Sequence, residues 1–313
     1  MRCKYDEVRY ELMDMAEETS RGLELVEGVP MKDAYQVLVN YLIPMIGFWM
    51  VDQDVDAIPK DVMVEIWEDL MADVEPDWYW DIYDSAERRE VLPVLKEMEA
   101  ELLIEMLTGK MKVLSQTGEN VYRFSKPLYK TYFAAREICG KLECMAEIAE
   151  DAKEMEDEGL KAEAAEFVVE ELAFFEEKIW PKEVLRMCAE HFRIPDTIPH
   201  QCLEGWFQDQ GMSMRKEMNL FRREPENPVM DVLQNRRALA GEGKEFYFEK
   251  NLLEMLRQGR QAKHYVDFTG IDFHGIDLTG VDLCQVVFAH KRRGEVWAAN
   301  LKDTGVEAYF ANK

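Results

Sequence analysis

The chain has 313 residues, of which 47% are hydrophobic, and its formal net charge is −25. This hydrophobic content supports a substantial core and excludes a disordered acidic tail. The charge is uneven: residues 211–313 hold 16 basic and 15 acidic side chains, which leaves 22 basic and 48 acidic side chains in residues 1–210. An acidic surface repels the phosphate backbone, so the composition argues against direct nucleic-acid binding and permits a protein partner with a basic surface.

The N-terminal third is predicted to be helical. Apolar residues three and four apart predict helices over 4–22, 31–50 and 60–73. The first residues lack the apolar stretch of a secretory signal, and the run 37–51, which contains Pro44, is short for a membrane span and suits a kinked core helix. Six cysteines in such a chain favour reduced thiols. We therefore expect a cytoplasmic protein that does not bind a membrane.

Three aspartates follow this run with the spacing of the first ligands in a calcium-binding loop. They are Asp52, Asp54 and Asp56, but Ala57 replaces the required glycine and Met63 the bidentate glutamate. The failed pattern favours a solvated linker between two helices over a calcium site.

A β-hairpin is predicted after the next helix, which is expected over 86–108. Two β-like runs, 110–115 and 121–125, flank the turn-forming residues QTGEN. A helix followed directly by a hairpin resembles the end of a winged-helix unit. The preceding helix, EMEAELLIEM, is acidic where a DNA-reading helix would be basic. The resemblance therefore implies packing against protein.

Helices are next predicted over 128–157, 160–178 and 181–192, with Phe167 among the residues of the buried face. Between Glu143 and Glu177 there are 14 acidic residues against two lysines, which predicts an interaction face. The residues assigned to this face are Glu143, Glu147, Glu150, Asp151, Glu154, Glu170 and Glu171.

A Cys/His cluster follows in the segment MCAEHFRIPDTIPHQC. Cys188, His191, His200 and Cys202 have the spacing C-x2-H-x8-H-x-C, and four such ligands would suit a closed structural zinc site. The competing interpretation is that these side chains are buried for packing alone, without a cofactor. The sequence has no phosphate-binding loop, dinucleotide fingerprint or G-x-S-x-G motif, so no catalytic residue is predicted.

After weaker helices over 213–223, 227–240 and 244–258, the chain repeats every five residues. The units VDFTG, IDFHG, IDLTG, VDLCQ and VVFAH, then AANLKD after an interruption at 291–298, place one apolar residue at each central position. These central residues are Phe268, Phe273, Leu278, Leu283, Phe288 and Leu301. The pattern resembles the pentapeptide-repeat family, whose units follow A-(D/N)-(L/F)-x-x.

That resemblance implies a right-handed quadrilateral β-helix in which the six central residues point inward. Some members of the family are long rods that mimic DNA, and others belong to bacterial effectors. The repeats here suffice for about two coils, and a short solenoid buries too little core alone. We therefore expect the coils to dock on the helices or to pair with a second copy, forming a homodimer through the C-terminal coil.

The sequence thus predicts a mainly α protein: an acidic helical domain over 1–258 with one hairpin near 110–125, then a short β-helix over 259–313. The leading functional hypothesis is a non-enzymatic protein-binding module that acts as an acidic decoy, or DNA mimic, of a nucleic-acid-handling protein. Two alternatives stay open. One is an enzyme or effector with an active or metal site near residues 188–202, and the other is a structural oligomerisation protein.

Overall fold

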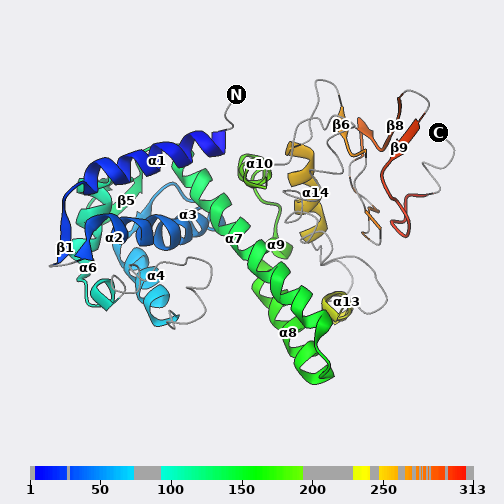
Figure 1. Ribbon diagram of the computed structural model, residues 1–313, viewed down its shortest axis with the longest axis horizontal. Helices are drawn as coiled ribbons and strands as arrows, with labels where there is room; N and C mark the ends of the chain where they lie inside the picture. Colours follow the sequence, from blue (N-terminus) through cyan, green and yellow to red (C-terminus); the bar gives the residue numbers. More distant parts are fainter. Residues whose placement is uncertain are drawn as a thin grey trace. The chain divides into compact units, whose positions relative to one another are not determined.

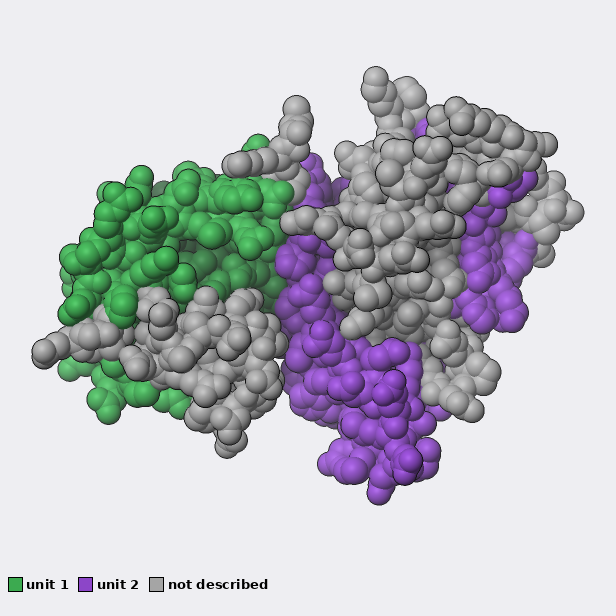
Figure 2. All heavy atoms as spheres, viewed as in Figure 1, with its two compact units in different colours: residues 1–138 green, residues 139–313 purple. Residues whose placement is uncertain are grey.

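The computed structural model describes residues 4–26, 29–73, 93–192, 228–239, 247–259 and 265–307, the last range without 270–272, 275, 277, 280, 282, 293 and 294. The chain forms two compact units, residues 1–138 and 139–313 (Figures 1 and 2). The division falls inside helix α7 (Pro127–Glu154) and differs from the boundary at 258/259, which stays a prediction. The described part is mainly helical, as the periodicity predicted.

Unit 1 contains the helices expected in the N-terminal third. They are α1 (Lys4–Ser20), α2 (Met31–Val37), the π-helical turn η1 (Leu38–Leu42), α3 (Ile43–Asp52) and α4 (Lys60–Asp73). Between α1 and α2, two short strands pair antiparallel, β1 (Glu24–Val26) with β2 (Val29–Pro30), and the sequence did not predict them.

The segment from α2 to α3 is one helical stretch that widens just before Pro44. Proline has no N–H group and cannot complete the usual α-helical ladder. In the π-turn the N–H of Ile43 instead donates to the carbonyl of Leu38, five residues earlier. The stretch Ala34–Asp52 has 19 residues and a mean hydropathy of 1.4, so by length and composition it could cross a membrane. The apolar run 37–51 alone had been too short for a membrane span, but the helix that contains it is longer. However, 61% of its most apolar window is buried within the protein, and a core helix passes the same test.

A three-stranded antiparallel sheet completes unit 1. The predicted hairpin is confirmed as β4 (Leu114–Gly118) and β5 (Val121–Phe124), and β3 (Ile58–Pro59) pairs with the other side of β5. Asn120 has a φ of 56° at the turn, a left-handed conformation that asparagine tolerates.

The helix predicted over 86–108 is confirmed only in part among its described residues. These are helical over 93–96 and 100–108, but the helix is interrupted at Met98 and Glu99, which are not helical. Helix α6 (Ala100–Glu105) begins after this break and continues into a second π-helical turn, η2 (Met106–Lys110), where the first β-run had been expected to start.

Unit 2 begins with the second half of α7. Its other described helices are α8 (Glu158–Glu171), α9 (Ala173–Glu177), α10 (Lys182–His191), α13 (Pro228–Leu239) and α14 (Phe248–Gly259). The helix predicted over 160–178 is divided at Leu172, and the one predicted over 213–223 lies outside the described residues. Asp157 caps α8, because its Oδ1 accepts hydrogen bonds from the N–H groups of Gly159 (2.8 Å) and Leu160 (3.1 Å).

Asn251 holds α14 against α9 and the chain that follows α9. Its side chain is fully buried. The amide Nδ2 donates to the carbonyls of Phe175 and Lys178, both at 2.8 Å, and Oδ1 accepts from the N–H of Trp180 at 3.0 Å. One side chain therefore satisfies three backbone groups in the core of unit 2.

The period-five segment pairs with itself at an offset of 20 residues. Strand β6 (Val266–Asp267) runs parallel to β7 (Val286–Val287), with Val266 opposite Val286. Further along, the N–H of Phe273 donates to the carbonyl of Asn300 (2.9 Å). Between these two contacts an antiparallel hairpin of β8 (Ala289–Arg292) and β9 (Glu295–Ala298) occupies the interruption in the repeat.

Four of the six central residues of the repeat are buried, namely Phe268, Phe273, Leu278 and Phe288. Leu283 and Leu301 are half-buried. The ring of Phe268 lies 5.3 Å from that of Phe273 and 5.8 Å from that of Phe288, between centroids. The central position of the five-residue unit therefore supplies most of the apolar core of this segment, together with Val266 and Ile276, which lie two positions before a central residue and are also buried.

Candidate protein-binding face on α7 and α8

The second half of α7 and helix α8 lie side by side in unit 2 and are joined by the three residues 155–157 (Figure 1). Lys141 of α7 joins them near the open end of this helical hairpin. Its Nζ lies 3.4 Å from Oε2 of Glu171 and 5.9 Å from the ring centroid of Phe174. Glu171, which the sequence predicts to belong to the binding face, therefore forms an ion pair within the hairpin.

The acidic residues of α7 form a row along the exposed side of the helix. Glu147, Glu150, Asp151 and Glu154 are exposed and Glu143 is half-buried. Because an α-helix rises 1.5 Å per residue, the five carboxylates from residue 143 to residue 154 span about 16 Å of helix axis. That is one carboxylate per about 4 Å, close to the 3.4 Å per charge along one strand of DNA, and Lys153 offsets one of the five charges by pairing with Glu150.

Helix α8 carries a second acidic row. Glu163, Glu166 and Glu170 are exposed. In the described part of the chain, no basic side chain forms an ion pair with these three residues. The two lysines within the acidic stretch pair locally, Lys153 with Glu150 at 3.3 Å and Lys161 with Glu158 at 3.7 Å. Most of the negative charge predicted from the sequence is therefore presented to solvent.

Two large apolar side chains are exposed on the same helix. Leu160 is 57% exposed and Phe167 is 46% exposed. The sequence-based assignment of Phe167 to the buried face is therefore wrong, because α8 buries Ala165, Val168 and Val169 instead. Leu160 and Phe167 are seven residues apart and lie two turns apart on one side of α8, which is also the spacing of a core-facing stripe, so the sequence held no signal of their exposure.

The α7 row also perturbs a nearby thiol. Cys144 is half-buried, and burial raises its pKa above the usual value, with a further contribution from the carboxylate of Glu147. A raised pKa keeps the thiol protonated at neutral pH, which does not suit a nucleophile.

The predicted zinc ligands are only partly within the described residues. Cys188 is buried in α10, and His191 at the end of α10 has Nε2 3.3 Å from Oε1 of Glu143. His200 and Cys202 lie outside the described residues. Among the residues that the structure does describe, no group of three or more His, Cys, Asp or Glu side chains could hold a metal ion. The zinc site stays a prediction that elemental analysis of the purified protein would test.

Asp56, the last of the three calcium-like aspartates, forms an ion pair in unit 1. The Nζ of Lys130 lies 2.5 Å from Oδ1 of Asp56 and 3.0 Å from the carbonyl oxygen of Val55. This ion pair lowers the pKa of the Asp56 carboxyl. A lysine ammonium thus binds two oxygens of the segment, which supports the interpretation as a linker.

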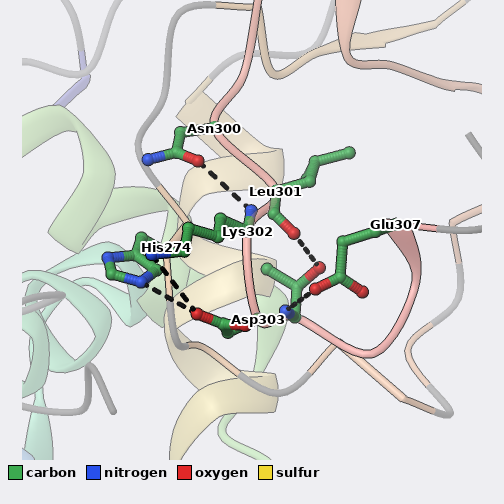
Figure 3. A network of polar contacts seen from close by, with 7 residues as sticks. His274, Asn300, Leu301, Lys302, Asp303 and Glu307 are labelled. Carbon is green, nitrogen blue, oxygen red and sulfur yellow. Dashed lines mark hydrogen bonds and ion pairs between the residues drawn. The ribbon is translucent and has the colours of Figure 1, made fainter. Parts of the chain in front are cut away.

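A polar network joins the repeat to the end of the described chain. Figure 3 shows His274 directed toward Asp303, with His274 Nε2 at 3.2 Å from Asp303 Oδ2. Next to this pair, the N–H of Thr304 donates to Glu307 Oε1 (2.8 Å) and its hydroxyl donates to the carbonyl of Leu301 (2.7 Å). The carbonyl of Thr304 accepts from the N–H of Leu278 (3.0 Å), so the network fixes residues 301–307 against the repeat.

No protein-family model, curated protein or solved structure matches the chain. The function of the protein is therefore inferred from the chemistry of its own residues. Among the features described above, the two acidic rows and the apolar residues beside them form the most extensive candidate site.

Proposed function

We propose that this protein is a non-enzymatic protein-binding module whose α7–α8 hairpin occupies a basic surface of a nucleic-acid-handling protein. The observation that carries the proposal is the charge spacing on α7, about 4 Å per carboxylate along the axis, which resembles the charge density of a DNA strand. A protein surface shaped to bind phosphates would meet a comparable row of negative charges. Acting as a DNA mimic, the hairpin would compete with nucleic acid for that surface.

The topology of unit 1 supports a related proposal, that this unit is a winged-helix module which packs against protein. Its order is helix α3, strand β3, helices α4 and α6, then the hairpin β4–β5, with β3 paired to β5. Helix α6, which stands where such modules place their DNA-reading helix, bears the exposed carboxylates of Glu101 and Glu105. Glu101 pairs with Lys60 at 2.6 Å, so one nearby positive charge is already neutralised. These features favour a protein partner over DNA.

We also propose that residues 266–307 form a short right-handed quadrilateral β-helix of the pentapeptide-repeat type. The support is the offset of 20 residues between Val266 and Val286, which equals four five-residue units, or one square coil. The β8–β9 hairpin would be an insertion within the second coil. If the last coil also joins two copies, deletion of residues 286–313 will halve the mass in solution, and an unchanged mass will exclude that dimer.

The decoy proposal is tested by affinity capture from the native host, followed by competition. Bait protein should recover basic nucleic-acid-binding proteins at low salt and lose them at high salt, since screening weakens surface charge pairs. The purified protein should then displace labelled DNA from the captured partner. Neutral or acidic captured proteins, or binding that is insensitive to salt, would overturn the proposal.

A charge-matched pair of variants locates the interaction. Replacing Glu147, Asp151 and Glu154 by Gln, Asn and Gln should raise the concentration needed to displace DNA at least tenfold. The control removes the same charge from α1 by replacing the exposed residues Asp14, Glu17 and Glu18 with Asn, Gln and Gln. The two variants have the same net charge, so they differ only in where the charge is removed. The control should compete within about twofold of wild type, because it leaves the carboxylates of α7 unchanged.

A further inference from the structure

We infer that the seam between the two acidic rows binds a basic amphipathic helix of the partner protein. The inference rests on the proposed function and specifies it, because it names the structural element that the acidic hairpin recognises.

The Lys141–Glu171 ion pair identifies the sides of α7 and α8 that meet at the seam. With 3.6 residues per turn, residues seven apart lie on nearly the same side of a helix. On α7, Ile148 follows Lys141 at an interval of seven, and Met155 is the first residue after the helix, in the connection to α8; both are half-buried. The α7 side of the seam therefore continues as an apolar stripe.

On α8 the corresponding stripe is more exposed. Phe167 lies one turn before Glu171, and Leu160 lies two turns before Phe167 on the same side. Their exposed fractions of 46% and 57% are high for apolar side chains that flank a helix–helix junction. Together Ile148, Met155, Leu160 and Phe167 form what we call the apolar seam.

Each acidic row lies on the outer side of its stripe. On α8, Glu163 and Glu170 are rotated from Leu160 and Phe167 by about 60°, on the side away from Glu171. On α7, Glu147, Asp151 and Glu154 are likewise rotated away from the stripe that contains Lys141. The exposed surface thus has the order acidic row, apolar seam, acidic row.

An amphipathic basic helix complements this surface in both respects. Its apolar residues, at intervals of three, four and seven, match side chains two turns apart in the seam, and its flanking Lys or Arg side chains reach the two acidic rows. A second copy of this acidic chain would bring like charges together, and DNA would be repelled. Charge and shape therefore favour a basic helix as the occupant.

The test uses the full chain and two synthetic peptides of 18 residues made of lysine and leucine. One peptide places its leucines on one side of a helix, and the other has the same composition with its leucines distributed around the helix. Fluorescence anisotropy measures the Kd of each. Wild-type protein should bind the amphipathic peptide at least tenfold more tightly, because only that peptide can bury its leucines in the seam.

Two double variants separate the seam from general surface effects. Leu160→Ala with Phe167→Ala should abolish the preference for the amphipathic peptide while leaving binding of the other peptide unchanged. The control, Tyr10→Ala with Met13→Ala, removes two comparably exposed apolar side chains of α1, 45% and 55% exposed, and should keep the preference. Circular dichroism establishes that both variants remain folded.

Equal affinity for the two peptides, or a preference that survives the Leu160/Phe167 change, would overturn the inference. So would a change in the mass of the protein in solution caused by that variant, because it would assign the seam to a second copy. These outcomes differ from failure of the decoy proposal. If the protein prefers the amphipathic peptide but displaces no DNA from any captured partner, the inference about the apolar seam stands and the DNA-mimic proposal fails.

Discussion

Gly47 of α3 lies directly against Phe133 of α7. A Cβ atom built at Gly47 would stand 2.8 Å from the Cβ of Phe133 and 3.0 Å from the backbone N of Ala134. Both distances are shorter than carbon and nitrogen atoms tolerate without contact strain. The two helices therefore approach each other through a position that only glycine can occupy, and this contact lies in the core of unit 1.

Gly47→Ala should destabilise the protein by about 1–3 kcal/mol, the usual cost of overpacking a core. The nearest atoms belong to the backbone and to a Cβ, which cannot move aside as the end of a flexible side chain can. Urea denaturation of the purified variant measures the change in the free energy of unfolding. An unchanged midpoint would mean that α3 and α7 separate at little cost.

Gly140→Ala should have the opposite effect. Gly140 is an exposed residue in the middle of α7, and no heavy atom lies within 4 Å of the position of an added Cβ. Because glycine is a poor helix former, alanine should stabilise the helix by about 0.5–1 kcal/mol. The same denaturation experiment applies, and a loss of stability would reveal a requirement for glycine that the helical geometry does not explain.

Asn251→Ala should destabilise unit 2 by about 2–4 kcal/mol. The substitution leaves two carbonyls and one N–H in a buried region without their partner, and each unsatisfied group is costly. Asn235→Ala on the exposed side of α13 is the matched control and should change stability by less than about 0.5 kcal/mol. Comparable effects of the two substitutions in thermal denaturation would contradict the role of Asn251.

The stability of unit 1 should depend on pH through Glu11. Its carboxylate accepts hydrogen bonds from the ammonium of Lys126 and from the hydroxyl of Tyr129 (2.7 Å), and these bonds lower the pKa of Glu11 from 4.5. A carboxyl whose pKa is lower in the folded state stabilises the fold above its ordinary pKa, and that contribution disappears as the pH falls through the lowered value.

Glu11→Gln should therefore reduce stability at pH 7 by less than about 1 kcal/mol, since the pair is half-exposed, and should have little effect well below pH 4. Thermal denaturation of both proteins between pH 3 and pH 7 measures this convergence. Glu18→Gln on the same helix serves as the control. A constant difference at every pH would exclude the carboxylate as the cause.

The core of the repeat segment should respond according to burial. Phe273 is fully buried, so Phe273→Ala should cost about 3–5 kcal/mol, whereas Leu283→Ala at a half-buried central position should cost less. Thr279→Ala, at an exposed position of the repeat, should cost less than Phe273→Ala. Chemical denaturation measures the free energy of unfolding of the three variants. A loss for Phe273→Ala no larger than that for Leu283→Ala would contradict the assignment of Phe273 to the core of the repeat.

Local features of the sequence predicted much of this structure. The spacing of apolar residues predicted α1, α4, α7 and α10, because a helix must present one apolar side to a core wherever it packs. The residues QTGEN predicted the β4–β5 turn, where Asn120 adopts a positive φ. The period of five predicted which phenylalanines are buried, because the repeat returns one position to the interior in each unit.

Other features required contacts between distant residues. The pairing of Ile58 with Tyr122 adds β3 to the hairpin, and nothing in the two residues of β3 indicates a partner 64 positions away. The π-turn before Pro44 depends on how the helix accommodates a missing N–H inside a core. The parallel pairing of Val266 with Val286 likewise joins residues 20 positions apart, and neither two-residue strand indicates its partner.

The sequence by itself determined that this protein is acidic, mainly helical and repetitive near its end, because composition and periodicity belong to the chain before it folds. Only the tertiary structure decided which acids and apolar residues share a surface. Phe167 has the spacing of a core residue, yet the Lys141–Glu171 pair and the packing of Val168 and Val169 orient α8 so that Phe167 reaches solvent. Helix rotation depends on the neighbours that a helix packs against, and those neighbours are remote in sequence.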